Sequence, residues 1–359
     1  MGHCPGEASV RLCGTTLLAS CLVATGFSFA QQASSSRKSK GALEANGPKI
    51  VESRYGRENW SSLSLADSAI HMDDALVGEK DAEQDYTREL LRVQWRDGDP
   101  IDLYVIRPVR VENPPVVLYL YGYPTDTKRF LDDNYCRRVT RDGFAAVGFL
   151  PALTGQRYHD RPMKQWFVSE LRESMVLSVH DAQMVINYLS HRGDLDVSSL
   201  GVFGSGSGGS IAILAAGVDK RIRTIDLLDP WGDWPDWLAE SSLVPEVERP
   251  QYVKPEFLKQ VAPYDPVQWL PQLKSQTIRL QHVMDDPVTP RTAKDKIEAA
   301  APHSVQLVHY DDSPALFKAS AGGALFNWIK QQLRPAGRGH GSAASSGPGQ
   351  VSSGQRPSA

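Results

Sequence analysis

One glycine-rich segment of the 359-residue chain has the residue types and spacing for nucleophilic chemistry. Residues 201–209 read GVFGSGSGG, with an apolar strand pattern before them and a helix pattern after them. A strand that turns sharply into a helix presents one side chain at the turn, and a serine there attacks a carbonyl carbon when a base accepts its proton. Ser205 and Ser207 lie in this segment. The chemistry that the segment suggests is hydrolysis of an ester or peptide bond.

The strand, the glycine turn and the helix together resemble the G-x-S-x-G nucleophile elbow of the α/β-hydrolase superfamily. The resemblance is strongest to the dienelactone hydrolase-like and prolyl-oligopeptidase-like branches, and it covers roughly residues 85–333. It implies an α/β fold with a mostly parallel sheet of about eight strands and helices on both faces. It also implies a Ser-His-Asp triad. We expect no cofactor and no metal.

Two registers of this motif are compatible with the segment. If the glycines at 204 and 208 are those of the motif, Gly206 occupies the nucleophile position; in a relaxed pattern, Ser207 or Ser205 is the alternative nucleophile. Members of the superfamily place a pair of small residues nine and ten positions after the nucleophile, and residues 215–216, both alanine, meet that spacing from Gly206. Glycine also adopts the strained turn freely, whereas a side chain there costs about 1–3 kcal/mol. We therefore favour Gly206, which leaves the nucleophile missing.

The resemblance also places the acid and the histidine. Residues 281–290, QHVMDDPVTP, resemble the strand-end G-x-x-D-x-x-x-P of the superfamily and put Asp286 at the acid position. An aspartate that closes a turn before a proline explains the same residues, so both interpretations stay open. Residues 310–317, YDDSPALF, resemble the segment that carries the histidine and put Ala315 at its position. The expected site keeps the acid and lacks the nucleophile and the base.

Residues 121–124, YGYP, stand where related sequences often carry H-G-x-P. The resemblance implies an oxyanion hole formed by backbone N–H groups of Gly122, Tyr123 and Ser207. The glycine, rather than the side chain before it, permits the turn. We therefore expect this cradle to persist.

Three tryptophans follow a predicted strand, at the edge where open α/β sheets bind ligands. They are Trp231, Trp234 and Trp237 in the segment PWGDWPDW. Their rings could stack on a sugar or an aromatic ring of a small-molecule or peptide ligand. The alternative is that they cap the core beneath a short lid.

Apolar periodicity predicts the elements that must position these residues. The expected strands are 91–95, 101–106, 116–120, 144–149, 200–203, 222–228, 277–283 and 305–310. The expected helices are 129–142, 171–189, 210–217, 292–301 and 319–333. The first two strands flank the turn DGDP, which predicts a hairpin. A hairpin followed by repeated strand–helix units predicts a mostly parallel sheet.

The two ends of the chain have a different composition from its centre. Residues 1–30 contain Arg11, an uncharged apolar stretch and small residues before position 31, which is typical of an export signal. Within it, the segment LASC resembles a lipobox with Cys21 as the lipidated residue. Residues 31–47 predict a flexible linker and residues 336–359 a disordered tail, leaving a folded domain over 48–335. We expect an exported protein, periplasmic, envelope-attached or extracellular, with an uncleaved signal anchor as the alternative.

The composition narrows the function further. The chain has 39 basic and 42 acidic side chains, so it has no basic field for nucleic acid. Membrane contact is expected only through the N-terminal lipid or signal anchor. The leading hypothesis is an exported α/β-hydrolase-type protein that binds a ligand or partner and has lost hydrolysis. The alternatives are an active ester or peptide hydrolase using Ser207 or Ser205, and a non-catalytic scaffold of the cell envelope.

Overall fold

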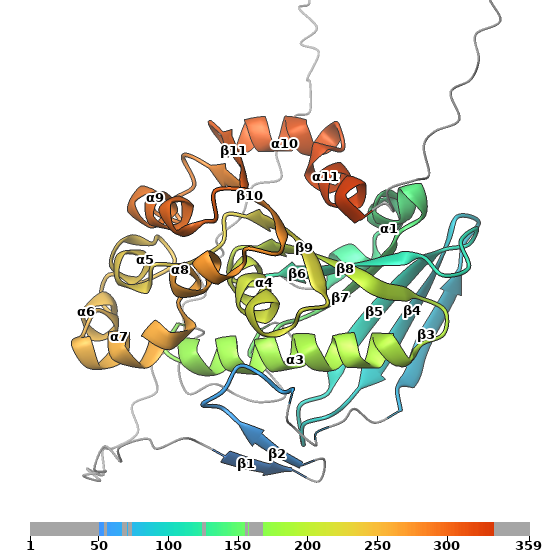
Figure 1. Ribbon diagram of the computed structural model, residues 1–359, viewed down its shortest axis with the longest axis horizontal. Coiled ribbons are helices and arrows are strands. Elements are labelled where there is room, and N and C mark those ends of the chain that lie inside the picture. Colours follow the sequence, from blue (N-terminus) through green and yellow to red (C-terminus); the bar gives the residue numbers. More distant parts are fainter. Residues whose placement is uncertain are drawn as a thin grey trace, which may run out of the picture. The chain divides into compact units, whose positions relative to one another are not determined.

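A sheet of nine strands lies at the centre of the part of the chain that the computed structural model describes (Figure 1). The described residues are 50–53, 56–66, 70, 74–123, 127–154, 157 and 168–333. The expected export signal, the linker and the C-terminal tail beyond 335 lie outside them. The strands are β3 (Leu76–Ala82), β4 (Tyr86–Val93), β5 (Ile101–Pro108), β6 (Pro115–Tyr121), β7 (Ala145–Phe149), β8 (Asp196–Ser205), β9 (Ile222–Leu228), β10 (Thr277–Val283) and β11 (Gln306–Tyr310).

The strand order is β11-β10-β9-β8-β6-β7-β5-β4-β3. All pairings from β11 to β7 are parallel, and β5, β4 and β3 join the sheet antiparallel. The mostly parallel sheet and the β4–β5 hairpin confirm the expected fold class. The ninth strand, β3, was not predicted, because every one of its residues is exposed or half-buried and it has no apolar alternation. A separate antiparallel pair, β1 (Ile50–Ser53) and β2 (Gly56–Asn59), precedes the sheet.

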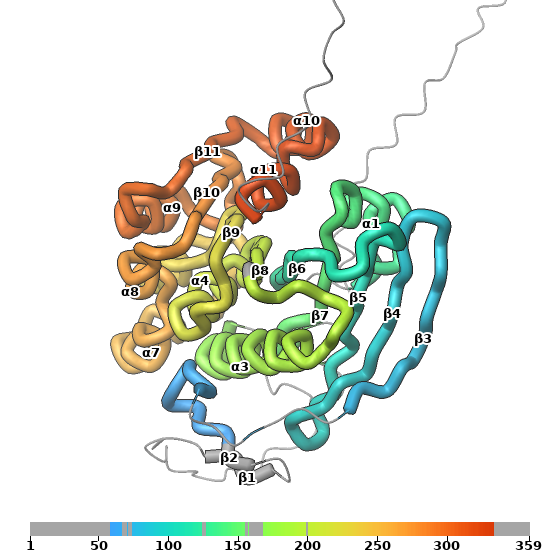
Figure 2. The backbone as a smooth tube through the Cα atoms, turned by 45° about the vertical axis from the view of Figure 1, so that its right-hand side comes forward, coloured from blue at the N-terminus to red at the C-terminus, as the bar shows by residue number. Residues whose placement is uncertain are grey.

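Helices cover both faces of the sheet (Figures 1 and 2). The helical elements are η1 (Lys128–Leu131), α1 (Asp133–Thr140), η2 (Arg141–Gly143), α3 (Leu171–His191), α4 (Ser207–Val218), α5 (Trp234–Glu240), α6 (Arg249–Tyr252), α7 (Pro255–Val261), η3 (Ala262–Tyr264), α8 (Pro266–Trp269), η4 (Leu270–Gln272), α9 (Arg291–Ala300), α10 (Ser313–Ala321) and α11 (Ala324–Leu333). Within the described ranges, no helix is both long and apolar enough to cross a membrane.

Two apolar core clusters lie on opposite faces of the sheet. Successive side chains of a strand point to opposite faces, so alternate residues of β6 and β8 belong to different clusters. Leu118 and Val202 pack with α3 and α4, whereas Tyr119 and Phe203 pack with α1 and α11. Ser205 has the same parity as Phe203 and therefore belongs to the α1 and α11 face.

Two expected helices differ in the structure. The helix expected over 319–333 is α10 and α11, separated at Gly322 and Gly323; Gly323 has φ +83°, a left-handed conformation that glycine favours. The helix expected over 129–142 is one α-helix, α1, between two short 3₁₀ turns. The short helices between residues 234 and 272 were not predicted, because each is too short to show a clear helical period.

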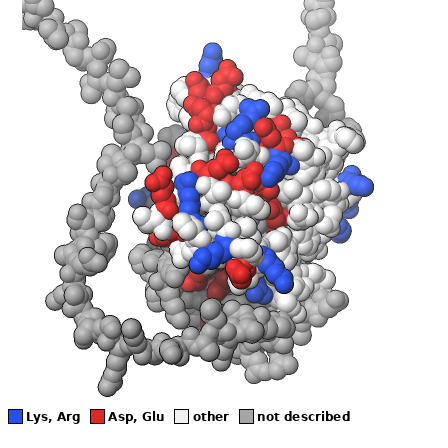
Figure 3. Space-filling model, turned by 90° about the vertical axis from the view of Figure 1, so that its left-hand side faces the viewer, with Lys and Arg blue, Asp and Glu red and all other residues white. Residues whose placement is uncertain are grey.

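The charge distribution agrees with the balanced composition. The molecular face in Figure 3 mixes acidic and basic side chains, without a single-sign field across it.

Candidate functional site

Gly206 lies at the apex of the turn between β8 and α4. Its backbone angles, φ 57° and ψ −127°, lie in a region that side-chain-bearing residues rarely adopt. The N–H of Gly206 donates to the carbonyl of Leu228 at 3.0 Å, and its carbonyl accepts the N–H of Trp231 at 3.3 Å. Ser205 ends the strand and Ser207 begins the helix. The apex, from which a nucleophile would project, therefore holds no side chain.

Trp231 occupies the space in front of this apex. A Cβ placed on Gly206 would lie 3.3 Å from the indole Nε1 of Trp231 and 3.7 Å from its Cε2. The indole is buried, with 2% of the residue exposed, and the Ser210 hydroxyl donates to the Trp231 carbonyl at 2.7 Å. The apex of the turn thus faces the buried indole ring of Trp231.

Two of the backbone N–H groups expected in the oxyanion hole, those of Gly122 and Tyr123, have acceptors within the protein, and Gly122 donates to the Ser205 carbonyl at 3.1 Å. The backbone N–H of Tyr123 donates to Ser207 Oγ at 2.9 Å, and Ser207 is fully buried. A Cβ on Gly122 would lie 2.6 Å from the Ser207 backbone nitrogen, so only glycine allows this approach. The Tyr123 donor therefore already has an acceptor, and Ser207 lies on the first helical turn. Pro124, the last residue of the YGYP segment, lies outside the described residues.

Asp286 follows β10, as expected for the acid position. Its two carboxylate oxygens accept the backbone N–H groups of Val288, at 3.3 Å, and Thr289, at 3.2 Å. Burial, followed by the nearby charge of Asp229, raises the pKa of Asp286. These contacts are those of a turn-closing aspartate, and they are compatible with the acid position too.

A second aspartate at this edge, Asp229, was missed. It directly follows β9 with φ +43°, and its Oδ1 accepts the Val283 N–H at 3.0 Å and lies 3.3 Å from His282 Nδ1. His282 is fully buried in β10. Within the described residues no serine hydrogen-bonds to this histidine, so the Asp–His pair has no nucleophile. The signal that could have revealed Asp229 is an aspartate between a predicted strand and a proline.

Ala315, at the expected histidine position, lies in a helix rather than in the loop that the resemblance implied. It is in the first turn of α10, and its N–H donates to Asp312 Oδ1 at 2.8 Å. Asp312 thus caps the helix, which explains why α10 begins at Ser313. No histidine lies between residues 310 and 333.

The three tryptophans are buried: Trp231 precedes α5, and Trp234 and Trp237 lie on it. Trp234 and Trp237 are fully buried, and Trp231 stacks on Trp237 with ring centroids 4.5 Å apart. Trp234 meets Trp237 edge-on at 6.0 Å. The proposed ligand-stacking role needs an open ring face, which this packing does not provide. The structure favours the packing alternative because burying large aromatic rings is strongly stabilising.

A cavity of 260 Å³ lies beside the elbow on the α1 and α11 face, and we call it the Ser205 pocket. Its lining residues come from β6, η1, α1, β8, β9, α10 and α11: Tyr121, Arg129, Tyr135, Arg138, Phe203, Ser205, Leu228, Ser320, Leu325 and Phe326. This lining contains no histidine and no carboxylate. Among the described residues of this pocket, Ser205 therefore has no general base.

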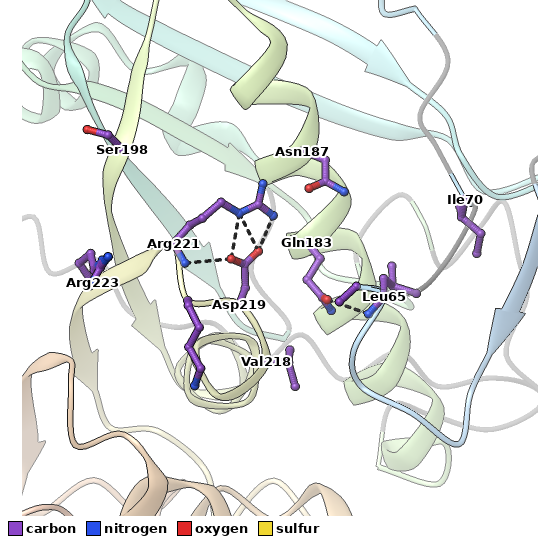
Figure 4. Close-up of a pocket in the computed structure, with 11 residues that line it drawn as sticks. Leu65, Ile70, Gln183, Asn187, Ser198, Val218, Asp219, Arg221 and Arg223 are labelled. Carbon is purple, nitrogen blue, oxygen red and sulfur yellow. Dashed lines mark hydrogen bonds and ion pairs between the residues drawn. The ribbon is translucent and has the colours of Figure 1, made fainter.

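A larger cavity of 540 Å³ lies at the amino ends of the strands, where β8 and β9 begin (Figure 4). Its polar wall includes Asp219 and Arg221, whose guanidinium is hydrogen-bonded to both oxygens of that aspartate. Gln183 on α3 accepts the Leu65 N–H at 2.9 Å. This cavity is separate from the elbow.

Comparisons with known proteins support the fold. No protein-family model matches the sequence, and no curated protein matches it. Acetyl xylan esterase from Paenibacillus sp. R4 has a similar structure, with a TM-score of 0.58 and 15% identity over 76% of this chain and 92% of that chain. Acetyl xylan esterase 1 from Thermoanaerobacterium sp. JW/SL YS485 gives a TM-score of 0.56 and 14% identity over 72% and 88% of the two chains. Pyrococcus horikoshii acylaminoacyl peptidase gives a TM-score of 0.52 and 12% identity, over 76% of this chain and 52% of that chain.

These proteins have the α/β-hydrolase fold, and this chain therefore has it too. At such low identities the likeness establishes the fold alone. The activity of this chain has to be argued from its own residues.

Proposed function

We propose that this protein is a non-hydrolytic α/β-hydrolase-fold protein that binds a ligand or partner at the carboxyl edge of its sheet. One observation carries the proposal. Gly206 occupies the apex of the elbow, and the Trp231 indole lies 3.3 Å from where its Cβ would be. Removing the nucleophile of a serine protease costs on the order of 10⁶ in rate, so a glycine at this position abolishes efficient hydrolysis.

Neither neighbouring serine replaces the missing nucleophile. Ser207 is buried and its Oγ accepts a hydrogen bond from the Tyr123 N–H, and no histidine or carboxylate among the described residues hydrogen-bonds to it. Ser205 faces a pocket whose described lining includes arginines but no histidine or carboxylate. A serine hydroxyl without a base is a weak nucleophile. The hydrogen bond to Ser207 and the lining of the Ser205 pocket argue against the alternative of an active ester or peptide hydrolase.

The test is labelling of the purified full-length protein with a fluorophosphonate probe, together with hydrolysis of 4-nitrophenyl acetate. We expect labelling and hydrolysis no greater than those of a heat-denatured sample, and no change in Ser205→Ala or Ser207→Ala. Labelling of the wild type that either substitution abolishes would establish the hydrolase alternative and refute the proposal.

We also propose that the protein is exported, as the composition of residues 1–30 suggests. Mass spectrometry of the protein purified from its natural source should find a mature chain that begins at Gln31 or at a lipidated Cys21. An intact N-terminus at Met1 in a cytoplasmic fraction would contradict export.

A further inference from the structure

The Ser205 pocket contains a concentration of positive charge. Arg129 and Arg138 both line it, and within the described residues neither has a carboxylate within 4.0 Å. Arg137, the neighbour of Arg138 on α1, instead lies 3.9 Å from Glu83 and 3.5 Å from Asp85. Two arginines without a carboxylate partner among the described residues therefore line a single cavity, Arg129 half-buried and Arg138 exposed at its rim.

One of these arginines is held in place. The guanidinium carbon of Arg129 lies 3.5 Å from the centroid of the Tyr121 ring, and Tyr121 is 7% exposed. Tyr121 OH lies 3.1 Å from Tyr135 OH, so the two phenols form a polar pair in the same wall. Stacking over an aromatic face keeps a guanidinium oriented while leaving its N–H groups available to an anion.

The rest of the lining combines hydroxyl groups with an apolar surface. Ser205 and Ser320 contribute the hydroxyls, and the apolar side is formed by Phe203, Leu228, Leu325 and Phe326. An inorganic anion would leave this apolar surface without a partner. A ligand that carries one anionic group and an apolar body would contact both sides.

We infer that the Ser205 pocket binds a small monocarboxylate with an aromatic or branched apolar body, with Arg129 and Arg138 holding the carboxylate. The guanidinium fork matches a carboxylate in bidentate geometry, which favours this class. The cavity volume of 260 Å³ is slightly below the usual range of ligand sites, about 300–1,000 Å³, so the ligand is small. The inference rests on the proposed binding function and names the ligand class for it. No bond is made or broken.

The experiment is isothermal titration of the full-length protein with phenylacetate, phenylacetamide and inorganic phosphate. We expect phenylacetate to bind, and its neutral amide to bind about tenfold more weakly, a difference of about 1.4 kcal/mol, because the amide lacks the charge that strengthens the hydrogen bonds from the arginines. Arg129→Gln and Arg138→Gln should each weaken phenylacetate binding about tenfold. Arg137→Gln removes the same charge from the same helix outside the pocket, and it should change affinity less than about twofold.

Three outcomes would overturn the inference: equal binding of phenylacetate and phenylacetamide, an equal loss of affinity in Arg137→Gln, or no binding of phenylacetate and of two further acids titrated in the same way, benzoate and 4-methylpentanoate. Phosphate binding that depends on Arg129 and Arg138 without binding of these acids would also overturn it. Circular dichroism of each variant checks folding, and Arg138→Gln keeps the test valid if loss of the Arg129–Tyr121 stack unfolds the protein. Fluorophosphonate labelling is independent of this titration, so failure of the pocket and failure of the proposed function are distinguishable.

Discussion

At the scale of single residues, Gly206 adopts a backbone conformation that favours glycine. The backbone at the elbow is strained for any residue with a Cβ, and the nearest side chain in front of it is a buried tryptophan. Once glycine stands at this apex, the tryptophan has room to pack against it. Introducing a serine would therefore meet both backbone strain and a steric contact with Trp231.

We predict that Gly206→Ser lowers the free energy of unfolding by about 1–3 kcal/mol, because φ 57° with ψ −127° disfavours a side chain. It should produce no measurable ester hydrolysis, since the new hydroxyl has no base. Urea denaturation followed by tryptophan fluorescence measures the change. Gly193→Ser is the matched control, because a Cβ on Gly193 would meet nothing within 4 Å. Equal stabilities of the two variants would contradict the strain argument.

Ser207 has a structural role that its substitution should reveal. Ser207→Ala removes the acceptor of the half-buried Tyr123 N–H, so we expect the free energy of unfolding to fall by about 0.5–1.5 kcal/mol. Ser205→Ala is the control on the same turn, and it should change the free energy of unfolding by less than about 0.5 kcal/mol. Thermal and urea denaturation measure both variants. A Ser207→Ala protein as stable as the wild type would show that this hydrogen bond contributes nothing.

At the scale of elements, a buried lysine joins α11 to the end of α1. Lys330 Nζ donates to the carbonyls of Arg138, at 3.0 Å, and Arg141, at 2.8 Å, and only 2% of the residue is exposed. These carbonyls lie at the carboxyl end of α1, where a positive charge is favourable. Since α1 and α11 supply two walls of the Ser205 pocket, this contact also sets the shape of the pocket.

We predict that Lys330→Met, which keeps the apolar stem and removes the donors, lowers the free energy of unfolding by about 1–3 kcal/mol. It should also weaken phenylacetate binding, because Arg138 would no longer be held relative to α11. Lys318→Met on α10 is the control, since Lys318 is exposed. Denaturation and titration together test this prediction, and a stable Lys330→Met variant with unchanged affinity would disprove the coupling.

At the scale of the whole molecule, a buried ion-pair network joins segments far apart in the sequence. Arg96 pairs with Glu58, Asp99 and Asp181, and Arg157 pairs with the same two aspartates. Burial alone would raise the pKa of Glu58, but hydrogen bonds from Arg96 and His180 outweigh it and lower that pKa to about 2. The pKa of Asp99 is likewise lowered, by Arg157 and Arg96, against the effect of burial.

This network predicts a loss of stability in acid. A carboxylate whose pKa is lower in the folded state stabilises the fold above its unfolded pKa, about 4.3 for glutamate, and that contribution is lost as the pH falls. For Glu58 the loss should be on the order of 3 kcal/mol between about pH 5 and pH 2. Urea midpoints measured across this range should fall steeply in the wild type and less steeply in Glu58→Gln. Glu83→Gln, which changes an exposed carboxylate, should follow the wild type; parallel curves for all three proteins would refute the assignment.

The sequence by itself determined the alternation of strands and helices and the strand–turn–helix position of the elbow, with Gly206 at its apex. These features depend on local periodicity and on glycine spacing within one strand–turn–helix unit, which a single chain displays directly. The bounds of β9 and β10 were predicted residue for residue for the same reason. Short or exposed elements such as β3 and α5–α8 gave no such pattern.

Only the tertiary structure decided what surrounds the elbow. Ser207 meets Tyr123 across 84 residues of sequence, and His282 meets Asp229 across 53, because the strand order places the ends of β6, β8, β9 and β10 at one edge. The packing of Trp231 against Gly206 and the convergence of Arg129 and Arg138 on one cavity also depend on that order. Contacts between side chains of separate elements follow from three-dimensional packing, and no local pattern in the sequence specifies them.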